Sequence, residues 1–118
     1  MAESPHCSDL EVVDNEYLDR DYNIDISIPE FNCICPRTGL PDFAIIKIQY
    51  VPDRLIVELK SLKLYVVKFR NVGIFHEHVT NRMLDDFVKA VRPKKIKIQG
   101  DFSPRGGIKT SVEAQWGK

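Results

Sequence analysis

Two consecutive segments of the chain place their apolar residues at helical spacing. In 61–72 these residues are Leu62, Tyr65, Val66, Phe69 and Val72, and in the next segment they are Phe75, Val79, Met83, Phe87, Val88 and Val91. Steps of three and four residues align side chains along one face of an α-helix. Asn71 and Gly73 form a stop signal between the segments, and Pro93 follows the second. The pattern predicts two successive amphipathic helices.

Segments on both sides of this helical pair alternate with a period of two or are rich in Ile and aromatic residues, which is typical of β-strands. They are 43–51 and 54–59 before the helices, and 95–102 and 108–116 after them. Pro52-Asp53 and the segment 103–107 are turn signals within each pair, and such short connections favour antiparallel pairing. The expected order is strand, strand, helix, helix, strand, strand.

That order predicts an α+β fold in which two helices lie on one face of a four-stranded antiparallel sheet. The opposite face of so small a sheet needs a cover, which indicates oligomerisation. The segment 23–28 (NIDISI) alternates and predicts a short extended piece. We interpret the polar and acidic residues 1–22 as a tail with at most a short ordered piece, and 23–118 as a single domain.

The segment 31–43 (FNCICPRTGLPDF) holds two prolines and a glycine. The residue before a proline is biased away from the helical region, so we expect a loop here. Its apolar residues Phe31, Ile34 and Phe43 indicate a loop that packs onto a scaffold.

Composition narrows the class of protein. The chain has 118 residues, 43% of them hydrophobic and 29% charged, as in a soluble globular domain. It has neither an apolar run of the roughly 20 residues that a membrane helix needs nor the start of a signal peptide. An odd count of three cysteines predicts reduced thiols in the cytoplasm. The formal net charge of zero argues against nucleic acid as the partner, because phosphate binding draws on a basic excess.

Cys35 is the first candidate for chemistry. A thiol becomes a nucleophile when it ionises, and a bend in the segment 31–43 would bring Asp42 close to it. The alternative is that Cys33 and Cys35 are small packed residues. A second alternative is zinc bound by these two cysteines with His76 and His78, although one-residue spacing departs from the usual spacing of structural zinc sites.

Two further groups of residues allow both a structural and a functional interpretation. His76 and Glu77 stand at the start of the second helix, where an acid is stabilised by the helix dipole. A carboxylate can also accept two hydrogen bonds from a guanine-like edge, and a histidine can move protons near neutral pH. Lysines around the junction at 58–68 form either a solvated helix face or a phosphate site. The sequence has no G-x-G-x-x-G, so a dinucleotide would bind outside a Rossmann fold.

Three motifs carry a family resemblance: CPRTGLPDF (35–43), ELKSLKLYVVKFRN (58–71) running on into GIFHEH (73–78), and GDFSPRGG (100–107). Together they are similar to the short form of the NADPH-dependent 7-cyano-7-deazaguanine reductases, the nitrile reductases of the queuosine pathway. The resemblance extends from about residue 24 to 118, and 58–65 has the family's cofactor-associated form E-(S/L)-K-S-x-K-x-Y. It implies the tunnelling fold of GTP cyclohydrolase I, a ββααββ unit with two antiparallel helices. Such units join into an oligomeric barrel with active sites between subunits.

The same resemblance implies the site residues. Cys35 would attack the nitrile carbon to form a covalent thioimide, and Asp42 would protonate the nitrile nitrogen, with His76 assisting. Substrate binding would fall to Val57, Glu58, Leu59, His76 and Glu77. NADPH would be held by Lys60, Ser61 and Lys63, with Arg105 as a further candidate, and no metal is implied. The substrate is then a small molecule, with neither nucleic acid nor membrane as a direct partner.

Three rival functions stay open at this point. A relative with the same fold keeps the cysteine and the aspartate but forms an amidine on nitrile-bearing tRNA, and it lacks the lysine-rich motif that is complete here at 58–65. A zinc-dependent cyclohydrolase-like enzyme of this fold is the second. The third is a non-catalytic interaction domain, which would leave the joint presence of Cys35, Asp42 and Glu77 to chance.

Overall fold

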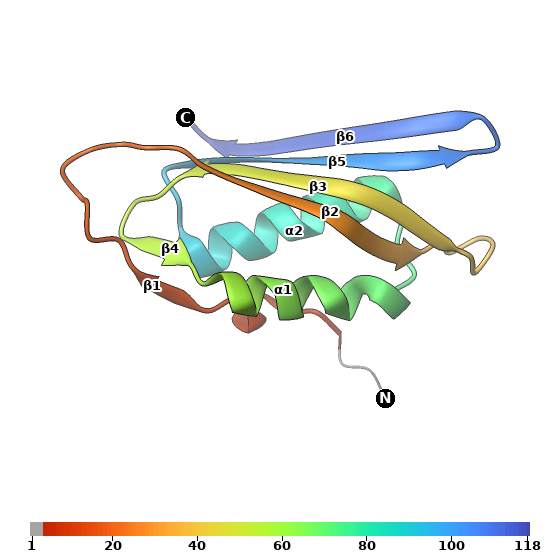
Figure 1. Ribbon diagram of the computed structural model, residues 1–118, viewed down its shortest axis with the longest axis horizontal. Coiled ribbons are helices and arrows are strands. Elements are labelled where there is room, and N and C mark those ends of the chain that lie inside the picture. Colours follow the sequence, from red (N-terminus) through yellow and green to blue (C-terminus); the bar gives the residue numbers. More distant parts are fainter. Residues whose placement is uncertain (1–3) are drawn as a thin grey trace.

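The fold is built on one antiparallel sheet with two helices on a single face (Figure 1). The structure is a computed structural model that describes residues 4–118. The sheet has the strand order β2-β3-β5-β6, formed by β2 (Ile24–Ile34), β3 (Pro41–Val51), β5 (Lys95–Arg105) and β6 (Ile108–Gly117). Helices α1 (Leu59–Val67) and α2 (His76–Val91) follow the first strand pair in the chain. The predicted α+β fold with a four-stranded antiparallel sheet is therefore confirmed.

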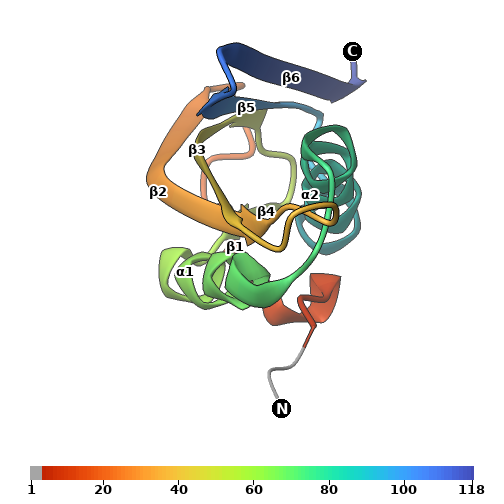
Figure 2. The same ribbon diagram turned by 90° about the vertical axis from the view of Figure 1, so that its right-hand side faces the viewer.

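Figure 2 shows both helices on the same side of the curved sheet. The strands face them with alternate residues: in β3, Ala44, Ile46, Ile48 and Tyr50 are buried, whereas the residues between them are exposed. Helix α2 contributes Val79, Met83, Phe87 and Val91 to the same core. Within the described residues, neither helix combines the length and the apolar character that crossing a bilayer requires.

The helix predictions hold with shifted boundaries. Helix α1 starts at Leu59, two residues before the predicted start, because the Glu58 carboxylate caps it by accepting hydrogen bonds from the amides of Lys60 and Ser61. It ends at Val67 and continues as the 3₁₀ turn η2 (Lys68–Asn71). Helix α2 matches the predicted segment, with Phe75 as its N-cap residue.

The predicted hairpin between 43–51 and 54–59 is wrong. Residues Leu55–Val57 form the short strand β4, which pairs with β1 (Val12–Asp14) in a separate two-stranded sheet. The sheet partners of β3 are instead β5 and β2, and β2 extends from Ile24 to Ile34. The expected loop at 31–43 is thus mostly strand, and only 35–40 connects β2 to β3. Of the two prolines that suggested a loop, Pro36 does lie in this connection, whereas Pro41 opens β3, a position where a strand tolerates proline.

The N-terminal segment is not a free tail over its described part, 4–22; residues 1–3 lie outside the described residues. Leu10 joins the hydrophobic core, and β1 pairs with β4. The Glu11 amide donates to the buried Ser61 hydroxyl over 2.9 Å, and Lys68 pairs with Asp9 at 3.0 Å. These contacts fasten the segment along α1, from Ser61 in its first turn to Lys68 just past its end.

The sheet face turned away from the helices is mostly polar. Ser27, Lys47, Gln49, Lys97 and Gln99 lie side by side on it around a shallow hollow. A polar face is stable against water, so the need for a cover, which the sequence suggested as the cause of oligomerisation, does not arise. Exposed apolar side chains gather only toward one end of this face, where Phe43 and Ile45 are 55% and 41% exposed.

Candidate active site

Cys35 is the first residue of the β2–β3 connection. The Cys35 amide donates to the Leu40 carbonyl over 2.8 Å, and the Gly39 amide donates to the Cys35 carbonyl over 2.9 Å. Gly39 has φ of 73°, a left-handed conformation that suits glycine. These bonds close a tight turn, so that Cys35, just past the end of β2, lies close to Asp42, the second residue of β3.

Hydrogen bonds within this turn lower the pKa of the Cys35 thiol below its ordinary value. The largest contribution comes from the Thr38 side chain, followed by the amides of Thr38 and Arg37. Donors aimed at sulfur stabilise the thiolate, which is the nucleophilic form. Cys33 is the opposite case: it is fully buried, and burial raises its pKa to about 12, with the charge of Asp42 adding to the effect. The prediction that Cys33 serves in packing agrees with its place in the core.

Thr38→Val should raise the pKa of Cys35, since it removes the hydroxyl that contributes most to thiolate stability. A raised pKa means less thiolate at neutral pH, so alkylation by iodoacetamide should slow and its pH midpoint should move upward. The measurement is site-resolved mass spectrometry of Cys35 alkylation across a pH series, with Thr110→Val on β6 as the control. An unchanged midpoint would show that the turn amides alone stabilise the thiolate.

Asp42 is the buried carboxylate of the site, with 6% of its surface exposed. Each of its oxygens has a partner: His76 Nε2 lies 3.0 Å from Oδ2, and Arg105 Nε lies 3.3 Å from Oδ1. The Arg105 guanidinium also donates to the Pro41 carbonyl. A carboxylate has about four lone-pair positions, so both oxygens can still bind a further group.

His76 is the first residue of α2, and the packing of its ring fixes its direction. The imidazole stacks on the fully buried Phe102 ring with centroids 3.8 Å apart and planes 5° apart. Glu77 follows in the first turn and is exposed. The start of α2 thereby presents one oriented imidazole and one free carboxylate beside Cys35.

These side chains surround a hollow of about 200 Å³. Its lining consists of Cys35, Pro36, Asp42, Phe75, His76, Glu77 and Arg105. Sites for drug-sized ligands usually enclose about 300–1,000 Å³. The hollow therefore offers room for a small ring system but not for a dinucleotide beside it.

The remaining predicted residues lie at the other end of the molecule. β3 begins next to the hollow and ends at Val51, and β4 and the start of α1 follow from there (Figure 1). An 11-residue strand spans about 35 Å. Val57, Glu58, Leu59, Lys60, Ser61 and Lys63 are thus remote from Cys35 of the same chain. A single chain does not bring the two predicted groups of site residues together.

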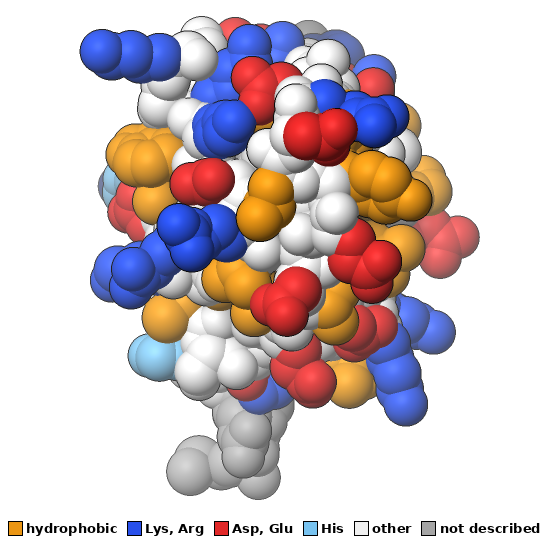
Figure 3. Space-filling model, turned by 90° about the vertical axis from the view of Figure 1, so that its left-hand side faces the viewer, with side chains coloured by type: hydrophobic (Ala, Val, Ile, Leu, Met, Phe, Trp, Pro, Cys, Tyr) orange, Lys and Arg blue, Asp and Glu red, His pale blue; other side chains and the backbone are white. Residues whose placement is uncertain are grey.

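Within this second group the side chains differ in what they can bind. Val57 is buried in the core, the Ser61 hydroxyl is engaged with Glu11 and Glu58, and the Glu58 carboxylate caps α1. Lys60 and Lys63 are exposed on the first turns of the helix. Figure 3 views this end of the molecule, where acidic and basic side chains are intermixed.

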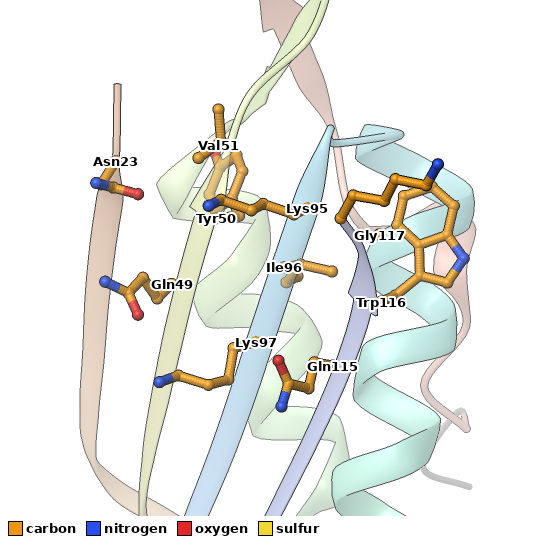
Figure 4. Close-up of a pocket in the computed structure, with 11 residues that line it drawn as sticks. Asn23, Gln49, Tyr50, Val51, Lys95, Ile96, Lys97, Gln115, Trp116 and Gly117 are labelled. Atoms are coloured by element: carbon orange, nitrogen blue, oxygen red, sulfur yellow. The ribbon is translucent and has the colours of Figure 1, made fainter. Parts of the chain in front are cut away.

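A larger hollow of about 420 Å³ opens at the end of the sheet remote from Cys35. Figure 4 shows its polar side chains on adjacent strands, among them Gln49, Lys95, Lys97 and Gln115. None of the predicted site residues lines it. As for zinc, no three His, Cys, Asp or Glu side chains of residues 4–118 come close enough together to hold a metal ion.

Comparison with known proteins first shows the fold and the family of this chain. Among solved structures, the archaeosine synthase QueF-Like in its apo form superposes with a TM-score of 0.76, over 81% of this chain and 94% of that chain, at 22% identity. This likeness shows the fold, which is the tunnelling fold expected from the sequence. The family model described as QueF-like protein matches residues 41–118, and the chain belongs to this family.

Curated relatives are more similar in sequence. The NADPH-dependent 7-cyano-7-deazaguanine reductase of Chloroherpeton thalassium is 57% identical over 107 residues, which cover 91% of this chain and 92% of that protein. Proteins of the same name from Elusimicrobium minutum and Chlorobaculum tepidum are both 51% identical, and the matches cover 93% and 92% of this chain and 83% and 93% of theirs. The family resemblance found in the sequence is confirmed.

Two residues of the site carried no signal of function in the sequence. Thr38 stands inside the CPRTGLPDF motif but became a candidate only once its hydroxyl was seen beside the Cys35 thiol. Phe102 looks like an ordinary core residue of a strand, and its stacking on His76 depends on how β5 packs against the start of α2. A contact between segments far apart in the chain, such as the stack of Phe102 on His76, leaves no periodic pattern in a sequence.

Proposed function

We propose that this chain is an NADPH-dependent 7-cyano-7-deazaguanine reductase, which reduces a nitrile to a primary amine in queuosine biosynthesis. The observation that carries the proposal is the convergence of Cys35, Asp42, His76 and Glu77 on one hollow, in a chain more than half identical to reductases of that name. Each of these four side chains has a task that nitrile reduction requires.

Cys35 serves as the nucleophile. Its lowered pKa favours the thiolate, and its position in the lining leaves the side chain accessible from the hollow. Attack on the nitrile carbon forms a carbon–sulfur bond and breaks one carbon–nitrogen π bond, which gives a thioimide. The nitrogen takes up one proton, which Asp42 delivers from the floor of the hollow with His76 as its hydrogen-bond partner.

Glu77 recognises the purine-like edge of the substrate. Its carboxylate is exposed at the hollow and free to accept two hydrogen bonds from the ring N–H and the amino group of the deazaguanine. His76 precedes Glu77 in the chain and pairs with Asp42. It therefore borders both the recognition edge of the substrate and the reacting nitrile.

Glu77→Leu should weaken binding of the nitrile substrate by roughly 100-fold, because two hydrogen bonds to a charged acceptor are lost. Calorimetry with a Cys35→Ala background prevents covalent capture from masking the loss. The melting temperature should fall only slightly, since the acid also favours the α2 N-terminus. Glu113→Leu, at an exposed carboxylate of β6, is the matched control, and equal affinity in the two variants would remove Glu77 from the recognition role.

NADPH supplies hydride to the substrate carbon, twice per nitrile. The chain offers Lys60 and Lys63, one helical turn apart and both exposed, for the cofactor phosphates. The backbone amides at the start of α1 do not contribute to this site, because the Glu58 carboxylate already accepts from them. Phosphate binding therefore depends on the lysine side chains, and Arg105 is a further candidate on the opposite side.

The functional unit is a homo-oligomer with active sites between subunits. Lys60 and Lys63 lie at the far end of the molecule from Cys35, and the hollow at Cys35 is too small for the cofactor, so a second copy must supply the missing half. Both edges of the sheet, β2 and β6, carry unpaired backbone groups available for such pairing. Val57, Glu58 and Leu59 then contribute backbone and side chains to a site shared with the neighbouring copy.

The cytoplasm suits this chemistry, because thiols stay reduced there and the mechanism needs Cys35 as a thiol. Amidine formation on tRNA is the alternative within the same fold. The complete motif at 58–65 favours reduction over this alternative, as does the balanced charge of the chain.

A further inference from the structure

Arg105 reaches the site because of an irregularity in β5. Phe102 pairs with Thr110 and Arg105 with Ile108, so β5 carries one residue more than β6 between these pairs. Regular alternation would turn Arg105 to the face opposite Phe102, and one extra residue reverses this. Arg105 therefore projects toward the face that holds Phe102 and Asp42. Bulges often re-aim a side chain in this way beside active sites.

The contacts of Arg105 are directed at the segment that carries Asp42. Its Nε lies 3.3 Å from Asp42 Oδ1, and its guanidinium donates to the carbonyl of Pro41, the preceding residue. His76 holds the other carboxylate oxygen at 3.0 Å and is itself fixed by stacking on Phe102. Side chains on both sides thus restrict rotation of the Asp42 carboxyl group, and one arm of this clamp comes from the β5 bulge.

We propose that Arg105 is a positioning residue for Asp42, which it holds in the orientation needed to protonate the nitrile nitrogen. This inference rests on the proposed function and adds a task for Arg105 that does not involve NADPH. Proton transfer demands that donor and acceptor stand within hydrogen-bond reach, so a carboxyl group that rotates freely loses rate. The planar guanidinium can hold the carboxylate and the Pro41 carbonyl at once, which a lysine ammonium on a flexible stem does less well.

Formation of the Cys35 adduct separates this role from cofactor binding, because the adduct forms from enzyme and nitrile alone. The carbon–sulfur bond forms, one carbon–nitrogen π bond breaks, and the thiol proton reaches nitrogen through Asp42, so no reductant enters. The test is the rate of adduct formation with 7-cyano-7-deazaguanine in the absence of NADPH, followed by rapid-mixing absorbance and intact-protein mass spectrometry. The proteins are the full-length wild type, Arg105→Ala, Arg105→Lys and the control Lys109→Ala, which removes a cation of the same hairpin.

Arg105→Ala should slow adduct formation about tenfold, Arg105→Lys should recover part of the rate, and Lys109→Ala should match the wild type. In an Asp42→Asn background, Arg105→Ala should add no further loss, because the group that it positions is already disabled. This non-additivity is a result that a general loss of folding would not produce. Equal thermal stability of the variants is checked alongside.

Two results would overturn the inference. One is an unchanged adduct rate in Arg105→Ala with only a higher KM for NADPH, which would assign Arg105 to the cofactor alone. The other is a full additional loss in the Asp42→Asn background, which would place its effect elsewhere. If the wild-type chain itself forms no adduct, the proposed function fails, and the inference fails with it.

Discussion

Cys35→Ala should abolish nitrile reduction while leaving the fold intact. The side chain belongs to the first residue of a turn and is only half-buried, so its loss leaves no large cavity in the core. Its sulfur forms the bond to substrate on which every later step depends, and kcat should fall by at least about 10³-fold. Binding of the nitrile should persist, because the recognition groups at the start of α2 remain. The measurement is turnover by NADPH consumption, together with calorimetric affinity for the nitrile.

Cys7→Ala provides the matched control, since Cys7 belongs to the 3₁₀ turn η1 (Cys7–Asp9) and lies outside the hollow. It should retain wild-type turnover. Cys33 is unsuitable as a control because it is part of the hydrophobic core. Turnover within a few-fold of wild type in Cys35→Ala would exclude covalent catalysis by this thiol.

Asp42→Asn should lower kcat by about 10²–10⁴-fold, the usual contribution of a general acid. Asparagine has the same shape and keeps an oxygen for Arg105, but its amide cannot deliver a proton to the nitrile nitrogen. Affinity for the nitrile should change little, because Asp42 lies at the reacting end of the substrate and Glu77 at the recognition edge. The check is single-turnover kinetics of adduct formation and reduction.

The control for this substitution is Asp101→Asn, which alters a carboxylate on β5 that pairs with Ser111 and lies outside the hollow. It should leave kcat unchanged. Comparable rates in Asp42→Asn and the wild type would mean that another group, with His76 as the nearest candidate, protonates the nitrogen.

The parts of the fold that the sequence predicted are those that depend on local pattern. Six apolar residues at helical spacing sufficed for α2, richness in Ile and aromatic residues sufficed for most of β3, and strict alternation sufficed for most of β5. Pairing was predicted less well, because pairing is a long-range choice. The turn at Pro52-Asp53 suggested that β4 folds back on β3, whereas its partner is β1, in a stretch too short and polar to stand out. Likewise, the prolines at 36 and 41 together predicted a loop, but only Pro36 lies in the connection between β2 and β3, whereas Pro41 opens β3.

The candidate site shows the same division. Cys35 and Asp42 are close in sequence, so a bend was enough to predict their approach, and the hairpin between β2 and β3 supplies it. His76 and Arg105 reach Asp42 from segments more than 30 residues away; the sequence singled out His76 as a possible proton carrier without linking it to Asp42, and only the family resemblance singled out Arg105. The clamp on Asp42 and the Phe102 stack depend on a bulge and on packing, neither of which has a sequence signature.

One measurement tests the central claim most directly: NADPH oxidation by the purified protein with and without 7-cyano-7-deazaguanine, combined with mass spectrometry of protein incubated with the nitrile alone. The account predicts two NADPH consumed per nitrile, with 7-aminomethyl-7-deazaguanine as product, and a substrate-sized adduct on Cys35. An adduct without NADPH consumption would point instead to the amidine-forming chemistry of the relative that acts on tRNA. Absence of both signals would contradict the assignment of this chain as a nitrile reductase.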